Sequence, residues 1–313
     1  MEISVRTAVS ELNEILAIDA THFSGSYWML AERAFHWHYP PTGAGIIHLP
    51  DGGISFEFPS VEQMKILRRI LIINGCVDVL CAVLSKVEFM TDLKKNSQID
   101  DNTWFRYVQS DIHTFHAEMR SLFDTIAVLL TELSPESHGG DSFARFRDMT
   151  SPFSRKKQTL TPEIKNLVAH CDWFDQLRNT RDAIMHDEKD AWVLWRTDDH
   201  ILFKLTYGEK FKNSGLADNR CLKYFLWHDW IDFRPYAGYY IGRLIAFLNK
   251  LTMYLTTESS VPSIETSITW RPNLVQTSIR YVAEARQVLA EVNQTAKQKF
   301  DRNWDRAFSQ PNW

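Results

Sequence analysis

The sequence predicts a mainly α-helical protein with two short β-hairpins. Glycine and proline interrupt regular elements, and they are few, with 12 Gly and 11 Pro in 313 residues. Long stretches repeat apolar residues every three or four positions, which is the spacing of one helix face. Two short segments instead alternate apolar and polar residues on either side of a turn, as strands of a hairpin do.

The elements expected before residue 60 are two helices and a hairpin, over residues 5–18, 26–38 and 45–58. Asp51-Gly52 supplies the hairpin turn between its two alternating segments. A longer helix then begins after Ser60 and runs towards Met90. The Asn74-Gly75 pair predicts a break inside that helix, because both residues disfavour a helix interior.

Residues 104–133 have a strongly helical apolar pattern, which runs from Val108 to Leu130. The opposite face is expected to be polar and to carry His113, His116, Arg120 and Asp124. This segment is therefore predicted to be a long amphipathic helix with one buried face.

The second half of the chain begins with the segment expected to be least structured, 134–162, which contains Ser-Pro, Gly-Gly and Thr-Pro steps. The elements expected after it are a helix, a second hairpin and two more helices, over 162–187, 191–207, 235–256 and 272–308. Gly238 and Gly242 are four residues apart, so the helix over 235–256 is expected to approach a neighbour closely.

The charge balance limits the kinds of partner that the chain can bind. The formal net charge is −4 and the isoelectric point is about 6.3. A molecule without a global positive field is expected to contact nucleic acid only locally. Gly-rich phosphate loops, nucleophile elbows and dinucleotide fingerprints do not occur in the sequence, which argues against kinases, serine hydrolases and dehydrogenases.

Cysteine usage and the N-terminus indicate a cytoplasmic protein. The four cysteines, Cys76, Cys81, Cys171 and Cys221, form no Cys-x-x-Cys pair and are typical of a reducing compartment. Acidic residues at Glu2, Glu11 and Glu14 are unlike a signal peptide. The apolar stretch 66–84 contains Arg68 and Arg69, and it is interpreted as a buried helix.

The helical segment 173–186 is the one most suggestive of chemistry. At 100° per residue, Arg181 falls within the apolar sector formed by Trp173, Phe174, Leu177, Ile184 and Met185. A guanidinium there is costly unless it is paired or borders a polar cleft. Arg178, Asp182 and His186 are spaced four apart, so Asp182 is expected to reach both neighbours.

A simpler interpretation also stands. An Arg–Asp pair on a helix is usually a surface ion pair, and a single histidine is usually solvated or satisfied by hydrogen bonds. The position of Arg181 on the apolar face argues against that interpretation for this residue, because a solvated face does not explain it.

Arg181-Asp182-Ala-Ile-Met-His186 resembles the motif of the HEPN superfamily (higher eukaryotes and prokaryotes nucleotide-binding), an arginine, a polar residue, three residues and a histidine. The resemblance covers roughly residues 100–257 and implies an HEPN-like helical bundle over 101–260. Residues 1–100 then form an N-terminal helical region with a hairpin, for which no family is named. Residues 261–313 form a long C-terminal helix.

The resemblance implies a metal-independent endoribonuclease in which a ribose 2′-OH attacks the adjacent phosphate. His186 would exchange protons, Arg181 would hold the phosphate, and Asp182 would orient the imidazole. It also implies a homodimer with a composite site, a toxin or antiviral-defence setting in a prokaryote, and an inhibitory or activating protein partner. No cofactor, metal or membrane is expected.

RNA contacts outside the motif are expected from Arg178, Lys156 and Lys157. The two lysines belong to a locally basic stretch in which Phe143, Phe146 and Phe153 are interleaved, a pattern that can grip phosphates and stack bases. A solvated loop with anchoring aromatic residues is the alternative. The histidine pairs at 36/38 and 113/116 have no third ligand at useful spacing, so no metal site is predicted.

Two further hypotheses remain open for the whole protein. One is a non-catalytic HEPN-fold protein that binds RNA or acts as a regulatory scaffold. The other is an all-α interaction protein in which Arg181 and Asp182 form an interface ion pair.

Overall fold

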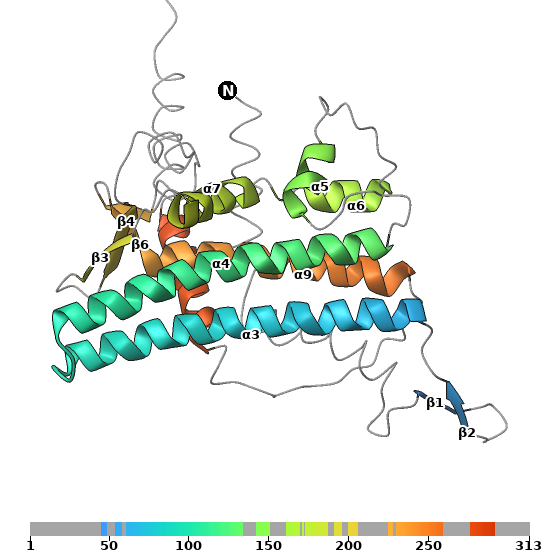
Figure 1. Ribbon diagram of the computed structural model, residues 1–313, viewed down its shortest axis with the longest axis horizontal. Coiled ribbons are helices and arrows are strands. Elements are labelled where there is room, and N and C mark those ends of the chain that lie inside the picture. The colour runs from blue at the N-terminus through green and yellow to red at the C-terminus, as the bar shows by residue number, and fades with distance from the viewer. Residues whose placement is uncertain are drawn as a thin grey trace, which may run out of the picture.

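A computed structural model shows a mainly helical protein (Figure 1). It describes residues 45–48, 54–57, 61–133, 142–150, 161–169, 171, 173–186, 191–195, 200–205, 225–227, 230–258 and 276–291. The helices expected over 5–18 and 26–38 lie outside these residues, as do Cys221, Lys156 and Lys157. The mainly α fold class is confirmed within the described part.

Two long antiparallel helices, α3 (Val61–Lys95) and α4 (Asp101–Leu133), form the centre of the molecule. The turn between them contains Ser97 in a left-handed conformation, with a φ of 54°. Asp100 then caps α4, because its carboxylate accepts hydrogen bonds from the backbone N–H and the hydroxyl of Thr103, both at 2.9 Å. The boundary expected near residue 100 falls in this turn.

The break expected at Asn74-Gly75 is wrong, since α3 is continuous. A glycine inside a helix costs only about 1 kcal/mol, which buried neighbours such as Ile73 and Val77 can offset. Within α3, Arg68–Lys95 is long and apolar enough to cross a membrane by length and composition, and 53% of its apolar window is buried inside the protein.

Helix α4 confirms the predicted apolar face, which packs against α3 and α9 (Phe233–Glu258). Phe123 lies at its centre, with ring centroids 5.1 Å from Phe174 and 5.6 Å from Phe247. The expectation that His116 lies on the polar face is wrong. It is fully buried, with Nδ1 2.7 Å from the Ile112 carbonyl oxygen and Nε2 2.8 Å from the Tyr236 hydroxyl.

Three shorter helices lie along the side of α4 (Figure 1): α5 (Phe143–Thr150), α6 (Pro162–Ala169) and α7 (Trp173–His186). The single helix expected over 162–187 is therefore wrong. The backbone N–H of Cys171 bonds to the Val168 carbonyl and that of Phe174 to the Cys171 carbonyl, and these turns redirect the chain. Helix α5 also falls inside the segment expected to lack structure.

Both predicted hairpins are confirmed. Strand β1 (Gly45–His48) pairs antiparallel with β2 (Ile54–Glu57). Strands β3 (Ala191–Trp195) and β4 (Ile201–Leu205) form the second hairpin, and β6 (Trp230–Asp232) and β5 (Leu226–Trp227) extend it. The result is a four-stranded antiparallel sheet in the order β3-β4-β6-β5.

Helix α9 begins directly after β6 and passes very close to the helix at 276–291. A Cβ atom at Gly238 would lie 2.0 Å from the Tyr281 carbonyl oxygen, which confirms the predicted close approach. Of the helix expected over 272–308, the structure describes only residues 276–291, where Val282 and Leu289 are buried.

Candidate functional site

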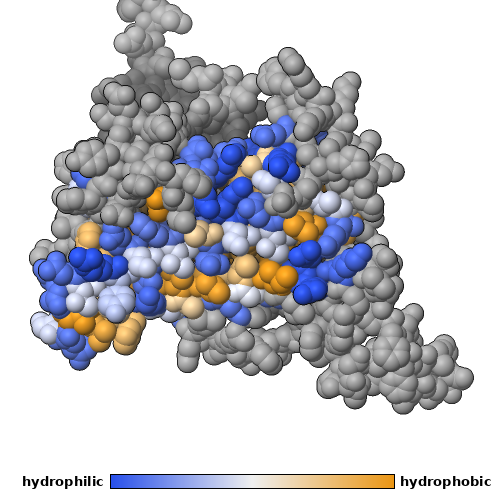
Figure 2. All heavy atoms as spheres, viewed as in Figure 1, coloured by the Kyte–Doolittle hydropathy of each residue, from blue (hydrophilic) through white to orange (hydrophobic). Residues whose placement is uncertain are grey.

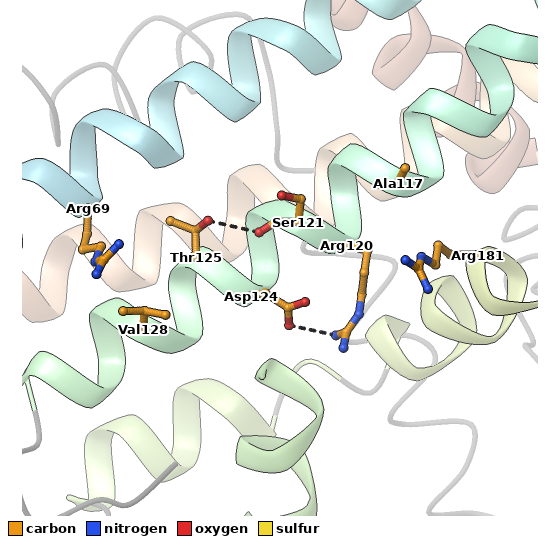
Figure 3. A pocket seen from close by; sticks show the side chains of 8 residues that line it. All are labelled: Arg69, Ala117, Arg120, Ser121, Asp124, Thr125, Val128 and Arg181. Carbon is orange, nitrogen blue, oxygen red and sulfur yellow. Dashed lines mark hydrogen bonds and ion pairs between the residues drawn. The ribbon is translucent and has the colours of Figure 1, made fainter. Parts of the chain in front are cut away.

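A polar cleft of about 350 Å³ opens where α3, α4 and α7 meet (Figure 3). Three arginines from three helices line it together with small and hydroxyl-bearing side chains of α4. The lining residues are Arg69, Ala117, Arg120, Ser121, Asp124, Thr125, Val128 and Arg181. Hydrophilic residues also gather on the visible face where α7 meets α4 (Figure 2).

Packing of aromatic side chains fixes the rotation of α7 and hence the position of Arg181. Trp173 and Phe174 are buried and lie with ring centroids 5.3 and 5.1 Å from that of Phe123 on α4. Leu177 is buried as predicted. With this face turned towards α4, Arg181 lies half-buried at the edge of the contact, with 26% of its side chain exposed. The prediction that the apolar stripe borders a polar cleft is consistent with its place in the lining.

The motif carboxylate is held between two arginines of its own helix. Arg181 Nη1 lies 3.0 Å from Asp182 Oδ1, and Arg178 Nε lies 3.5 Å from Asp182 Oδ2. The expected pairing of Arg178 with Asp182 is therefore confirmed. His186 is the last residue of α7, one helical turn beyond Asp182, and its side chain lies outside the described part of the structure.

Arg120 of α4 faces the motif from across the helix contact. Its Nη1 lies 3.2 Å from Asp124 Oδ1, and its guanidinium carbon lies 5.1 Å from the Phe174 ring centroid. Burial is the largest cause of a lowered pKa at Arg120, which has 16% of its side chain exposed. The positive charges of Arg178 and Arg181 lower that pKa as well.

Asp124 also makes a hydrogen bond to the start of α5. Its Oδ1 accepts a hydrogen bond of 3.1 Å from the backbone N–H of Phe143, the first residue of that helix. A carboxylate in this place satisfies a donor that the helix itself leaves unpaired and stabilises the N-terminal end of the helix dipole. Asp124 therefore links α5 to the cleft while it pairs with Arg120.

Among the described residues that form ion pairs around the cleft, positive charge is in excess by one. The charged groups that pair there are four arginines and three carboxylates, namely Arg69, Arg120, Arg178, Arg181, Asp124, Glu132 and Asp182. Each carboxylate forms an ion pair with at least one guanidinium, and its negative charge reduces the repulsion between the neighbouring arginines. Partly exposed guanidiniums in such a setting can bind an anion with several oxygens, such as a phosphate.

The two interpretations of the basic stretch before α6 can be compared with the structure at Phe143, Phe146 and Arg147. Phe143 and Phe146 are fully buried, so the expectation that these rings stack bases is wrong. Arg147 bonds to the carbonyl oxygens of Val168 and Ala169 at the end of α6 and lies 2.7 Å from Asp175. These three residues anchor α5 to its neighbours, as the alternative interpretation expected of the aromatic residues, but Phe143–Thr150 is a helix and not a solvated loop.

Among the described residues, no group of three or more His, Cys, Asp or Glu side chains is arranged to hold a metal ion. His113 and His116 do not form a pair of metal ligands, because both ring nitrogens of His116 make hydrogen bonds inside the core, one with Ile112 and one with Tyr236. Burial lowers the pKa of His116 to about 4, which keeps its ring neutral near pH 7.

Two arginines of the lining, Arg69 of α3 and Arg120 of α4, were not predicted as part of the site. Arg120 was expected only on the polar face of its helix. Both reach the cleft because α3 and α4 fold back on each other, which brings Arg69 Nε to 3.2 Å from Glu132 Oε1 across 63 residues of sequence. No local sequence signal marks either residue, because the register of the two helices brings them to the cleft.

Compared with models of known protein families, with curated proteins and with solved structures, the chain has no match.

Proposed function

We propose that the cleft between α3, α4 and α7 is the site of a metal-independent endoribonuclease of the HEPN type. The observation that carries this proposal is the position of Arg181, since the motif arginine lines the same cleft as Arg120 of a different helix. The resemblance of the motif on α7 supplies the reaction, and the cluster of guanidiniums supplies a place for the phosphate.

In this proposal, 2′-OH attack on the adjacent phosphate builds negative charge on the phosphate oxygens. Arg181 and Arg120 approach from two helices and offset that charge with donors that are already in place. Partial burial strengthens the interaction because the surrounding dielectric is lower than that of water. The account requires no metal, since the cations are side chains.

His186 exchanges protons with the 2′-OH or with the leaving 5′-oxygen. An imidazole with an ordinary pKa near ~6.5 is suited to both steps at neutral pH. Asp182, one turn earlier, would orient the ring. A homodimer with a composite site, and a role in toxin or defence systems of the cytoplasm, complete the proposal.

A second candidate function is RNA binding without cleavage. One observation favours it, namely that Asp182 already pairs with both Arg178 and Arg181. A carboxylate engaged in this way stabilises an arginine cluster that holds phosphate, whether or not it also orients a histidine. In this version the cleft binds RNA and His186 is dispensable.

The test is incubation of the purified protein with end-labelled single-stranded RNA and tRNA in EDTA. His186→Ala and Arg181→Ala are compared with two controls, His113→Ala on α4 and Asn179→Ala on the exposed side of α7. The proposal predicts fragments with cyclic-phosphate ends from the wild type and both controls, and none from the motif variants. RNA bound but left intact by the wild type would favour the second candidate.

A further inference from the structure

The floor of the cleft forms a shallow track along α4. Ala117, Ser121, Thr125 and Val128 follow one another at intervals of four, four and three residues, so they lie on one face of the helix. From the first to the last of them the helix rises by roughly 16 Å. These side chains are all small, and none of the described lining residues has an aromatic ring on which a base could stack.

The two ends of this track carry positive charge (Figure 3). Arg181 lies near the Ala117 end, where Arg120 also faces α7. Arg69 projects from α3 at the other end, beside Thr125 and Val128. A track with cations at both ends and uncharged, small side chains between them suits a ligand that has negative charge at intervals.

Arg69 is placed to bind an anion while it keeps its partner. Its Nε lies 3.2 Å from Glu132 Oε1, and 35% of its side chain is exposed. A guanidinium has five N–H donors in a fixed fork. It can therefore hold Glu132 through Nε and present its terminal nitrogens to a phosphate oxygen at the same time.

We propose that this track binds the backbone of single-stranded RNA through two separate phosphates, one at Arg120 and Arg181 and another at Arg69. The inference rests on the proposed function, because it takes the phosphate at Arg181 to be the one that is cleaved. A track of roughly 16 Å spans several nucleotides, since a stacked strand rises by about 3.4 Å per nucleotide.

The chemistry of the track sets what the site can discriminate. Contacts to phosphates position a strand but carry no sequence information, and the floor has no group that stacks on a base. Chain length is discriminated instead, because a mononucleotide can occupy only one end. The site therefore prefers oligonucleotides to mononucleotides and tolerates many sequences.

The first experiment measures binding to a labelled oligouridylate of roughly ten nucleotides, which is longer than the track. The measurement uses the full chain with His186→Ala and EDTA, so that the RNA stays intact. Arg69→Gln should weaken binding by about tenfold and lower the salt slope by about 0.7, as loss of one phosphate contact to a single strand does. Uridine monophosphate should bind equally to the protein with and without Arg69→Gln.

The matched control is Arg68→Gln, which removes the same charge from the next, exposed position of α3 outside the cleft lining. It should change the affinity by less than about twofold, since exposed charges act only through a screened field. Equal losses from Arg68→Gln and Arg69→Gln would overturn the track, because they would show only a general effect of net charge.

Two further variants test the track in opposite directions. Glu132→Gln should strengthen oligouridylate binding, because it removes the negative charge beside Arg69. Ser121→Glu places a carboxylate on the floor and should weaken binding, whereas Ser110→Glu should not, because Ser110 lies outside the described lining and roughly 16 Å before Ser121 along α4. An unchanged affinity with Ser121→Glu would also contradict the track.

Failure of the track and failure of the nuclease give different results. If the wild type leaves RNA intact but Arg69→Gln selectively weakens binding, the cleavage proposal fails and the track stands. If the wild type cleaves RNA and Arg69→Gln binds and cleaves normally, the track fails and the nuclease stands.

Discussion

Two arginine–carboxylate clusters in this molecule differ in burial and in charge balance. In the first, Glu88 of α3 accepts hydrogen bonds from Arg234 of α9 at 2.7 and 3.1 Å and from the hydroxyl of Tyr281 at 2.6 Å. In the second, around the cleft, Arg120 and Arg181 face each other across two helices and remain partly exposed.

In the buried cluster two arginines, Arg234 and Arg280, are balanced by two carboxylates, Glu88 and Glu284. Burial pushes the pKa of Glu88 upward, but the hydrogen bonds and charges of Arg234, with Tyr281 and Arg280, together hold it below its ordinary value. Because this cluster joins α3, α9 and the helix at 276–291, it holds the fold together. The cleft cluster has an excess of positive charge that open space and solvent can reach, which suits a ligand.

The largest effect should come from breaking the buried cluster. Arg234→Met leaves Glu88 with the half-exposed Arg280 as a remaining cationic partner, and it should lower the free energy of unfolding by up to about 3–5 kcal/mol. Urea denaturation measures this loss. Adding Glu88→Gln to the same chain should recover part of it, because the incompletely paired charge is then gone. No recovery would mean that lost packing, and not charge, causes the effect.

The next effect concerns the titration of His116, which is buried on α4 one helical turn before Arg120 at the cleft. The pKa of His116 is lowered from its ordinary value of 6.5 to about 4, first by burial and then by the nearby charge of His113, against the opposing hydrogen bond to Ile112. Between these values the unfolded chain binds a proton that the folded chain does not. Stability should therefore be fully present above pH ~6.5 and fall by about 3 kcal/mol towards pH ~4.

Unfolding free energies of the wild type and His116→Phe across this pH range check the prediction. The variant should lose the part of the pH dependence that lies between the two values. Parallel curves for the two proteins would show that the imidazole of His116 does not titrate in that window.

A smaller effect tests the close contact between α9 and the helix at 276–291, which carry Arg234 and Tyr281 of the buried cluster. At Gly238 a methyl group would meet the Tyr281 carbonyl oxygen, so Gly238→Ala should destabilise the protein by about 1–3 kcal/mol. Gly75→Ala is the matched control on α3, where nothing lies within 4 Å of an added Cβ. It should stabilise the protein by up to ~1 kcal/mol, since alanine is the better helix former. Equal effects at both positions would contradict the close approach of the two helices.

The smallest effect on stability should come from the cleft. Arg178→Gln removes a partly exposed ion pair with Asp182 at 3.5 Å and should change the free energy of unfolding by less than ~1 kcal/mol. Thermal or urea unfolding measures the change. A loss as large as that of Arg234→Met would show that the cleft cluster also holds the fold together.

Local periodicity was enough to predict α4, α9 and both hairpins, because each depends on residues close in sequence. The break between α6 and α7 was not predictable in that way. No glycine or proline marks residues 170–172, and backbone hydrogen bonds at Cys171 make the turn. Helix α5 was missed because its cap, Asp124, belongs to a different helix.

The same distinction between local and long-range contacts applies to the candidate site. Spacing within one helix placed Arg178, Arg181 and Asp182 together, and the structure confirms the Arg178–Asp182 pair that it predicted. Arg69 and Arg120 reach the cleft through the register of two helices and the packing of α7 on Phe123, which a single sequence does not specify. His116 was assigned to the wrong face because its residue type is polar, although its hydrogen bonds are satisfied inside the core.

The most direct test of the cleft as a working site is to measure RNA cleavage and unfolding on one variant, Arg181→Gln. The account predicts that the cleavage rate in EDTA falls by about 10²–10³-fold, as loss of one preorganised donor to a developing oxyanion does. The free energy of unfolding should stay within ~1 kcal/mol of the wild type. An unchanged cleavage rate together with a large loss of stability would contradict the account, because Arg181 would then hold the helices together and take no part in the chemistry.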